Sequence, residues 1–178
     1  MTGNSMDQFI SLKKQYKKDF LNELGLKEAK PLVAIVLDHE LSAKENVLLQ
    51  KIFEAVSHIR ANFVVVCDHH NTLKSTKNVI PLSYSQANRK KTLEAADMAL
   101  VFPFNDVQEM LLHGTIPITS LRPEVADYNP NRETGNSFIF TDQNQWAIFA
   151  ALVRAVETFK FPYDWNHIVR QGLKSVSV

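Results

Sequence analysis

Polar side chains follow two of the most hydrophobic segments of this sequence. Asp38, His39 and Glu40 come directly after one apolar run, and Cys67-Asp68-His69-His70 ends the next. Carboxylate, imidazole and thiolate are the groups that bind zinc and other transition metals. If the two runs are neighbouring strands, a metal site at one edge of the sheet is one interpretation. The other is that polar residues cap buried strands where the chain reaches water, since the HxxxH and CxxC spacings of metal sites are absent.

Two other residues could serve either a ligand or the core. His113 lies at a helix-to-strand junction, where it either contacts a ligand or interacts as a cation with the end of the helix dipole. Tyr84 lies at a strand-to-helix turn, where its ring either stacks on a base or covers the edge of the core.

The sequence contains no GxGxxG, GxxxxGK[ST] or GxSxG motif, so dinucleotide binding, P-loop phosphate binding and serine hydrolysis are not expected. No cofactor is expected.

The elements that position these residues show two hydrophobic periods. Apolar runs over 32–37 and 63–67 are typical of strands buried on both faces of a parallel sheet. Shorter strands are expected near 78–82, 98–102, 116–119 and 137–141. Helical spacing predicts helices over 7–24, 43–60, 85–96, 105–113, 143–160 and 164–172.

The order of these elements predicts an α/β fold, a three-layer Rossmann-like sandwich with a mostly parallel sheet. Its ligand crevice is expected at the carboxyl ends of the strands. Residues 1–30 are expected to hold an N-terminal helix that packs on a domain of residues 31–178. Ser42 is expected to cap the second helix in a capping box with Glu45. Segment 121–136 is predicted to be an irregular loop over the strand ends.

The composition restricts the class of function. A chain of 178 residues suits one domain, and 20 basic against 19 acidic residues give a net charge of +1. This balance gives no reason to expect a nucleic-acid or membrane partner. No apolar run approaches the roughly 18 residues of a membrane helix, and the polar N-terminus is unlike a signal peptide. Cys67 is the single cysteine, which suits a reducing compartment, so a cytoplasmic protein is expected.

Six segments are similar, in order, to motifs of one enzyme family. They are KDFLNELGL (18–26), PLVAIV (31–36), YSQA (84–87), ADMALV (96–101), HGTIPI (113–118) and ETGNSFIF (133–140). From about residue 13 to 173 the chain resembles the C-terminal domain of bacterial glycogen synthases and plant starch synthases. These are retaining glycosyltransferases that use ADP-glucose and have two Rossmann-like lobes, the GT-B fold. The resemblance implies a nucleotide-sugar donor-binding lobe.

Four positions match donor-binding positions of that family. The resemblance implies that Lys44 contacts the donor's phosphates and that Tyr84 stacks on adenine. It implies that Thr115 lines the same crevice, and that Glu109, at the second glutamate of an E-x7-E pattern, binds ribose hydroxyls. ADP or ADP-glucose is therefore the expected ligand, and an N-terminal lobe or a complete synthase the expected protein partner.

Other positions depart from the family. Asp38 stands where the family has a phosphate-neutralising arginine, and Pro103-Phe104 runs almost directly into Asn105, which removes a sugar-contacting glutamate. Ser120-Leu121-Arg122-Pro123 replaces a glycine-rich loop, and 178 residues are too few for two lobes. Because departure of a diphosphate needs stabilising positive charge, the resemblance implies weak binding of ADP or ADP-glucose without catalysis by this chain alone. The alternative is a pseudoenzyme, a structural or regulatory subunit of a glucan-synthesising complex.

Overall fold

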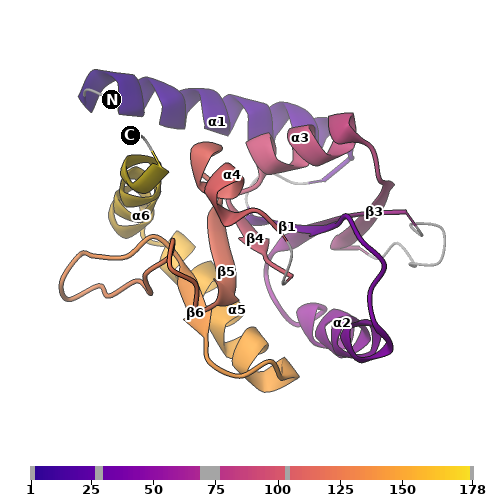
Figure 1. Cartoon of the computed structure of the whole chain (residues 1–178). Helices are drawn as coiled ribbons and strands as arrows, with labels where there is room; N and C mark the ends of the chain where they lie inside the picture. The colour runs from indigo at the N-terminus through magenta and orange to yellow at the C-terminus, as the bar shows by residue number, and fades with distance from the viewer. Residues whose placement is uncertain (1–2, 27–29, 69–76, 103–104, 177–178) are drawn as a thin grey trace.

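The computed structural model describes residues 3–26, 30–68, 77–102 and 105–176, and Figure 1 shows the arrangement of the chain. The helices are α1 (Gly3–Glu23), α2 (Ala43–Val56), α3 (Gln86–Ala95), α4 (Val107–Leu112), α5 (Gln145–Phe159) and α6 (Pro162–Val176). The strands are β1 (Leu32–Leu37), β2 (Asn62–Cys67), β3 (Val79–Ser83), β4 (Met98–Leu100), β5 (Ile116–Ser120) and β6 (Phe138–Phe140).

All six strands run parallel in one sheet of order β3-β2-β1-β4-β5-β6. The chain builds outward from β1 to β3 and then returns to the other side of β1 with β4. The direction of winding therefore reverses between β1 and β4, where open α/β sheets form their ligand crevice at the carboxyl ends of the strands. Here the register pairs Val33 with Met98 and Ile35 with Leu100.

Alternate side chains of the strands fill two apolar layers. On one face Val33, Ile35 and their neighbours pack against α2, α5 and α6. On the other face Ala34, Val36 and their neighbours pack against α1, α3 and α4. Figure 1 shows the sheet between α1 and α3 above and α2 and α5 below. The predicted three-layer α/β sandwich is confirmed, and the continuous apolar runs of β1 and β2 follow from burial on both faces.

Local signals set several helix ends. Ser42 and Glu45 form the predicted capping box at α2. Pro162 occupies the first turn of α6, which therefore begins before the predicted residue 164, because a proline at this position loses no helical hydrogen bond. The helix α2 ends at Val56, earlier than predicted, and turns at His58 and Ile59 lead into β2.

Segment 121–136 is irregular, as predicted, and it lies along the outer side of β6. Asp127 accepts a hydrogen bond from the backbone N of Ile139 at 2.8 Å and pairs with Arg154 of α5. The edge of β6 is thereby protected against pairing with another strand. Among the residues that the structure describes, no helix is long and apolar enough to span a membrane.

Candidate functional site

Asp38 and Asn105 meet where the sheet reverses its winding. Asp38 directly follows β1, and its Oδ1 accepts hydrogen bonds from Asn105 Nδ2 at 3.1 Å and, when His39 Nδ1 carries a proton, from His39 at 3.2 Å. Asn105 is 2% exposed, and its Oδ1 accepts from the backbone N of Phe102 at 3.2 Å. Arg122, from the loop after β5, donates to the carbonyl oxygens of Asn105 and Phe102 at 2.9 and 3.1 Å. The carboxyl ends of β1, β4 and β5 are therefore joined by polar side chains.

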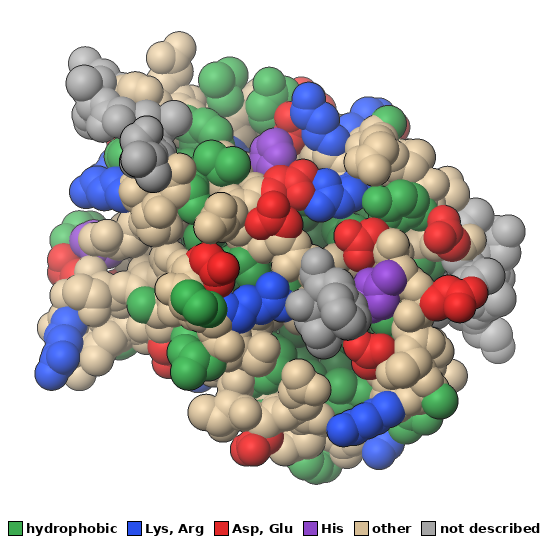
Figure 2. Space-filling view, viewed as in Figure 1, with side chains coloured by type: hydrophobic (Ala, Val, Ile, Leu, Met, Phe, Trp, Pro, Cys, Tyr) green, Lys and Arg blue, Asp and Glu red, His purple; other side chains and the backbone are tan. Residues whose placement is uncertain are grey.

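A second polar link joins α3 and α4 above this point. Both terminal nitrogens of Arg89 donate to the two carboxylate oxygens of Glu109. The pKa of Arg89 is raised, chiefly by the hydrogen bonds to Glu109, with smaller contributions from Tyr84 and Asp38. Of these two residues only Asp38 is charged near neutral pH, so Asp38 is a second anion near Arg89. Figure 2 shows acidic, basic and histidine side chains close together on this view of the molecule.

Tyr84 and Lys44 lie at the same edge of the sheet. Tyr84 follows β3, is half-buried against the α1–α3–α4 face of the core, and donates its backbone N–H to the carbonyl of Cys67 at 3.0 Å. The ring of Tyr84 can therefore both cover the core and stack on a base, because one part of it contacts the core and another part is exposed. Lys44 lies in the first turn of α2 and is exposed.

The N-terminus of α2 already carries a negative charge. Glu45 Oε2 accepts from the backbone N and the Oγ of Ser42, at 2.9 and 2.6 Å. These hydrogen bonds are the main reason that the pKa of Glu45 is lowered. Helix N-termini attract anions, and here the protein's own carboxylate occupies that place beside Lys44.

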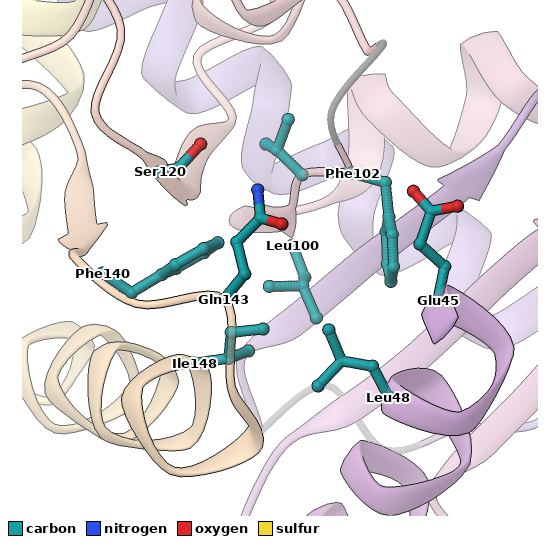
Figure 3. A pocket seen from close by; sticks show the side chains of 9 residues that line it. Glu45, Leu48, Leu100, Phe102, Ser120, Phe140, Gln143 and Ile148 are labelled. Atoms are coloured by element: carbon teal, nitrogen blue, oxygen red, sulfur yellow. The ribbon is translucent and has the colours of Figure 1, made fainter. Parts of the chain in front are cut away.

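Below the crevice lies a small apolar hollow between α2 and α5. Figure 3 shows Phe102 and Phe140 on either side of Leu100, with Glu45 and Gln143 at the rim. Its volume of about 40 Å³ leaves room for little more than one or two water molecules. This hollow is therefore too small to hold a nucleotide.

Thr115 lies at the amino ends of the strands, opposite the carboxyl ends where Asp38 and Tyr84 lie. Thr115 precedes β5 and is fully buried; its Oγ1 lies 2.6 Å from the carbonyl oxygen of Leu93 and accepts from Lys13 Nζ at 2.9 Å. The prediction that Thr115 lines the crevice is wrong, because this residue holds α1 against the amino ends of the strands. His113 lies at that edge too, and burial, followed by the charge of Lys13, lowers its pKa. The lowered pKa favours the neutral imidazole, which weakens the interpretation of His113 as a cation at the end of α4.

The metal interpretation receives no support from the part of the chain that the structure describes. Within it, no group of three or more His, Cys, Asp or Glu side chains is arranged to hold a metal ion. Asp38 and His39 lie together, whereas Asp68 is exposed after β2. His69 and His70 lie outside the described residues.

Sequence reasoning missed Arg89, Asn105 and Arg122. Arg89 follows the N-cap Ser85 by one helical turn, and helices that follow parallel strands begin at the carboxyl edge. The spacing of one turn between Ser85 and Arg89 could therefore have predicted a cation at the carboxyl ends of the strands. No comparable signal marks Arg122, because its two carbonyl partners lie in a separate loop.

Comparison with known proteins identifies similar sequences. No family model matches the chain. A glycogen synthase of Koribacter versatilis is 24% identical over 185 residues, and one of Fervidobacterium nodosum is 27% identical over 184. Each alignment covers 92% of this chain and 38% of the relative. The chain thus spans well under half the length of these relatives.

Solved structures of glycosyltransferases share the fold. The catalytic domain of starch synthase IV from Arabidopsis thaliana, bound to ADP and acarbose, matches with a TM-score of 0.71 at 20% identity, over 93% of this chain and 39% of that one. WaaG, a glycosyltransferase involved in lipopolysaccharide biosynthesis, matches with a TM-score of 0.60 at 16% identity, over 89% of this chain and 46% of that one. The resemblance of this chain to glycogen and starch synthases is confirmed, and its fold is the Rossmann-like fold of GT-B glycosyltransferase domains.

Proposed function

We propose that the crevice at the carboxyl edge of the sheet binds ADP or ADP-glucose weakly. The observation that carries this proposal is that a half-buried aromatic ring, Tyr84, and a guanidinium, Arg89 in the first turns of α3, both lie at the carboxyl ends of the strands. An aromatic face suits a purine base, and a guanidinium suits a phosphate. Lys44, exposed in the first turn of α2, provides a second cation. The starch synthase of similar fold binds ADP, which supports the same ligand class.

The surrounding charges are the reason to expect weak binding. The guanidinium of Arg89 is already paired with Glu109, the carboxylate of Asp38 lies near Arg89, and that of Glu45 lies at the N-terminus of α2 beside Lys44. To bind Arg89, a diphosphate must displace Glu109, and it must also approach the carboxylates of Asp38 and Glu45. We further propose that this chain does not transfer glucose by itself, since Asp38 places an anion where the departing diphosphate needs a cation.

Calorimetry with millimolar ADP and ADP-glucose tests the ligand. Replacing Tyr84→Ala removes the stacking face and is expected to weaken binding by about 1–3 kcal/mol, roughly 5- to 150-fold. Tyr16→Ala is the matched control, because Tyr16 is 53% exposed on α1. An absence of heat with both ligands contradicts nucleotide binding, and equal losses in the two variants contradict the role of Tyr84.

A glucosyl-transfer assay tests the second part of the proposal. The protein is incubated with ADP-glucose and glycogen, and release of ADP is followed with a complete glycogen synthase as the positive control. We expect no turnover above the protein-free rate. Turnover that Tyr84→Ala abolishes would show that the chain is an enzyme in its own right.

The second candidate function is that of a structural or regulatory subunit. The observation that favours it is that the crevice groups bind one another: Arg89 with Glu109, and Asp38 with Asn105. Co-sedimentation with glycogen and with a purified complete synthase tests this function. A protein that binds nucleotide well and sediments with neither would exclude it.

A further inference from the structure

A second cavity lies at the amino edge of the sheet, away from the crevice. It has a volume of about 280 Å³, is partly open to solvent, and lies between α1, the end of α5, and α6. Figure 1 shows α6 below the first half of α1, and an Arg170–Asp7 ion pair joins the two helices near one end. Pockets for drug-sized ligands begin at roughly 300 Å³, so this cavity suits a molecule with one ring.

The wall formed by α1 carries three lysines. Lys13, Lys14 and Lys17 line the cavity, and Asp97 is the one carboxylate among its lining residues that the structure describes. Lys17 Nζ lies 2.7 Å from Asp97. Lys14 is exposed and forms no hydrogen bond or ion pair with any described residue. The cavity therefore has more positive than negative charge, and one of its cations is available to a ligand.

The opposite wall is aromatic and held in place. Trp165 of α6 stacks on Phe138 with ring centroids 6.4 Å apart and an interplanar angle of 11°. Phe159 meets Trp165 edge-on at 5.1 Å, and Lys17 Nζ lies 4.8 Å from the centre of the Phe159 ring. Because these rings are fixed by their neighbours, a flat ligand would meet them without further loss of side-chain freedom.

We propose that this cavity binds a small organic phosphate, a phosphate monoester carried on a single ring. The excess of lysines favours a dianion, and a phosphate monoester carries a charge of about −1.5 to −2 at neutral pH. The aromatic wall accommodates the ring, and Lys14 at the mouth faces the phosphate. Lys13 Nζ donates to oxygens of Glu94, His113 and Thr115, so Lys13 acts on the phosphate through its charge and not through a hydrogen bond. The site is separate from the nucleotide crevice and does not depend on the function proposed for it.

Protonation of Lys13 adds a pH dependence to this binding. Burial lowers the pKa of Lys13 to about 7, opposed by the charges of Asp97 and Glu94 and reinforced by that of Lys17. His113 faces the same group, with its carbonyl accepting from Lys13 Nζ at 2.7 Å. A bound dianion favours the charged ammonium, so affinity is expected to fall as the pH rises from 7 to 9. Phosphate itself, with its second pKa near 6, changes little over that range.

Tryptophan fluorescence provides a direct measurement. The chain has two tryptophans, and Trp146 is 73% exposed on α5. A Trp146→Phe protein therefore leaves Trp165 as its single reporter, at the wall of the cavity. Phenyl phosphate, inorganic phosphate and phenol are the probes. We expect a saturable change with phenyl phosphate, and affinities at least ~10-fold lower for inorganic phosphate and for phenol, each of which lacks half of the interactions.

Three further substitutions in the Trp146→Phe protein locate the binding. Lys14→Gln is expected to weaken phenyl phosphate binding about 5-fold, whereas Lys18→Gln, an exposed lysine on α1 outside the cavity, leaves it unchanged. Asn166→Phe fills the cavity from α6 and is expected to abolish binding. Circular dichroism confirms that each variant is folded.

The proposal is overturned if phenyl phosphate produces no saturable change at millimolar concentration. It is also overturned if Lys18→Gln weakens binding as much as Lys14→Gln, since binding then depends only on the general charge of α1. A loss on Tyr84→Ala with no loss on Asn166→Phe would assign the probe to the nucleotide crevice instead.

Discussion

Lys17 and Asp97 at the amino edge of the sheet lie 2.7 Å apart with 9% and 12% of their side chains exposed. Arg89 and Glu109 at the carboxyl edge also pair, but with 15% and 30% exposed. The first pair is tied to the backbone, because Asp97 Oδ2 also accepts from the backbone N of Leu32 at 2.7 Å. The hydrogen bonds of the Arg89–Glu109 pair run from side chain to side chain, so no hydrogen bond to the backbone is lost when this pair separates.

Similar charged groups therefore have different roles at the two ends of the strands. At the amino edge, Lys13 donates to the carbonyl oxygens of Glu94 and His113, at 3.1 and 2.7 Å, and so fixes α1 to the loops before β4 and β5. Those polar groups stabilise the fold. At the carboxyl edge the pairs lie beside a half-buried tyrosine, where a ligand could exchange partners with them. Four predictions test this difference.

The largest effect is expected for Asp97→Ala. The substitution leaves Lys17 buried without its counter-charge and the backbone N of Leu32 without its acceptor. Removing one partner of a buried ion pair costs about 3–5 kcal/mol. Urea denaturation measures the free energy of unfolding. Asp7→Ala is the control, because the Asp7–Arg170 pair is exposed and is expected to contribute less than about 1 kcal/mol. Similar losses for the two variants would remove the distinction between a structural and a surface pair.

The second prediction concerns the dependence of stability on pH. The pKa of Lys13 is about 7 in the folded protein, below the value of about 10.4 for an unfolded chain. Between these values the unfolded state binds more protons, so the free energy of unfolding rises with pH. Urea denaturation at pH 7, 8 and 9 measures the slope. The Lys13→Met variant lacks this group and is expected to show a flatter slope, whatever its absolute stability. Equal slopes would mean that Lys13 titrates alike in both states.

The third prediction concerns Glu109 and the affinity for ADP. Replacing Glu109→Gln removes the negative charge that holds Arg89, so the guanidinium becomes available to phosphate. We expect ADP to bind roughly 3- to 10-fold more tightly by calorimetry, and adenosine to be unaffected. Glu94→Gln on α3 is the control, since Glu94 lies at the amino edge near Lys13. Weaker binding of both ADP and adenosine would instead support a contact between Glu109 and the ribose.

The sequence predicted best the features that depend on local patterns. The runs 32–37 and 63–67 identified the central strands, because burial on both faces leaves no polar position within them. Ser42 and Glu45 identified the start of α2, because both partners of a capping box lie within four residues. Thr115 was assigned to the wrong edge, although a residue just before a parallel strand must lie at its amino end.

Features that depend on distant contacts could not be predicted. Arg89 and Glu109 lie on two helices, and no hydrophobic period relates the rotation of one helix to that of the other. Lysines spaced between apolar residues on a helix predict a solvent-exposed face. Lys17 is nevertheless only 7% exposed, because its ammonium pairs with Asp97 and lies over the ring of Phe159. Charges fixed by tertiary packing leave no mark in the local sequence.

The smallest effect is expected for Asp38→Asn, which tests the acidity of the crevice alone. The amide keeps the oxygen that accepts from Asn105 Nδ2, so the link between β1 and β4 remains while one negative charge is lost. A charge about 4 Å away in a largely aqueous setting contributes about 1 kcal/mol, so ADP should bind roughly 5-fold more tightly. The gain should shrink as salt is raised, because screening weakens the repulsion that the substitution removes. Asp19→Asn, an exposed carboxylate on α1, is the control for net charge. If the two variants change ADP affinity equally, or if the gain is independent of salt, repulsion by Asp38 is not what limits nucleotide binding at the carboxyl edge.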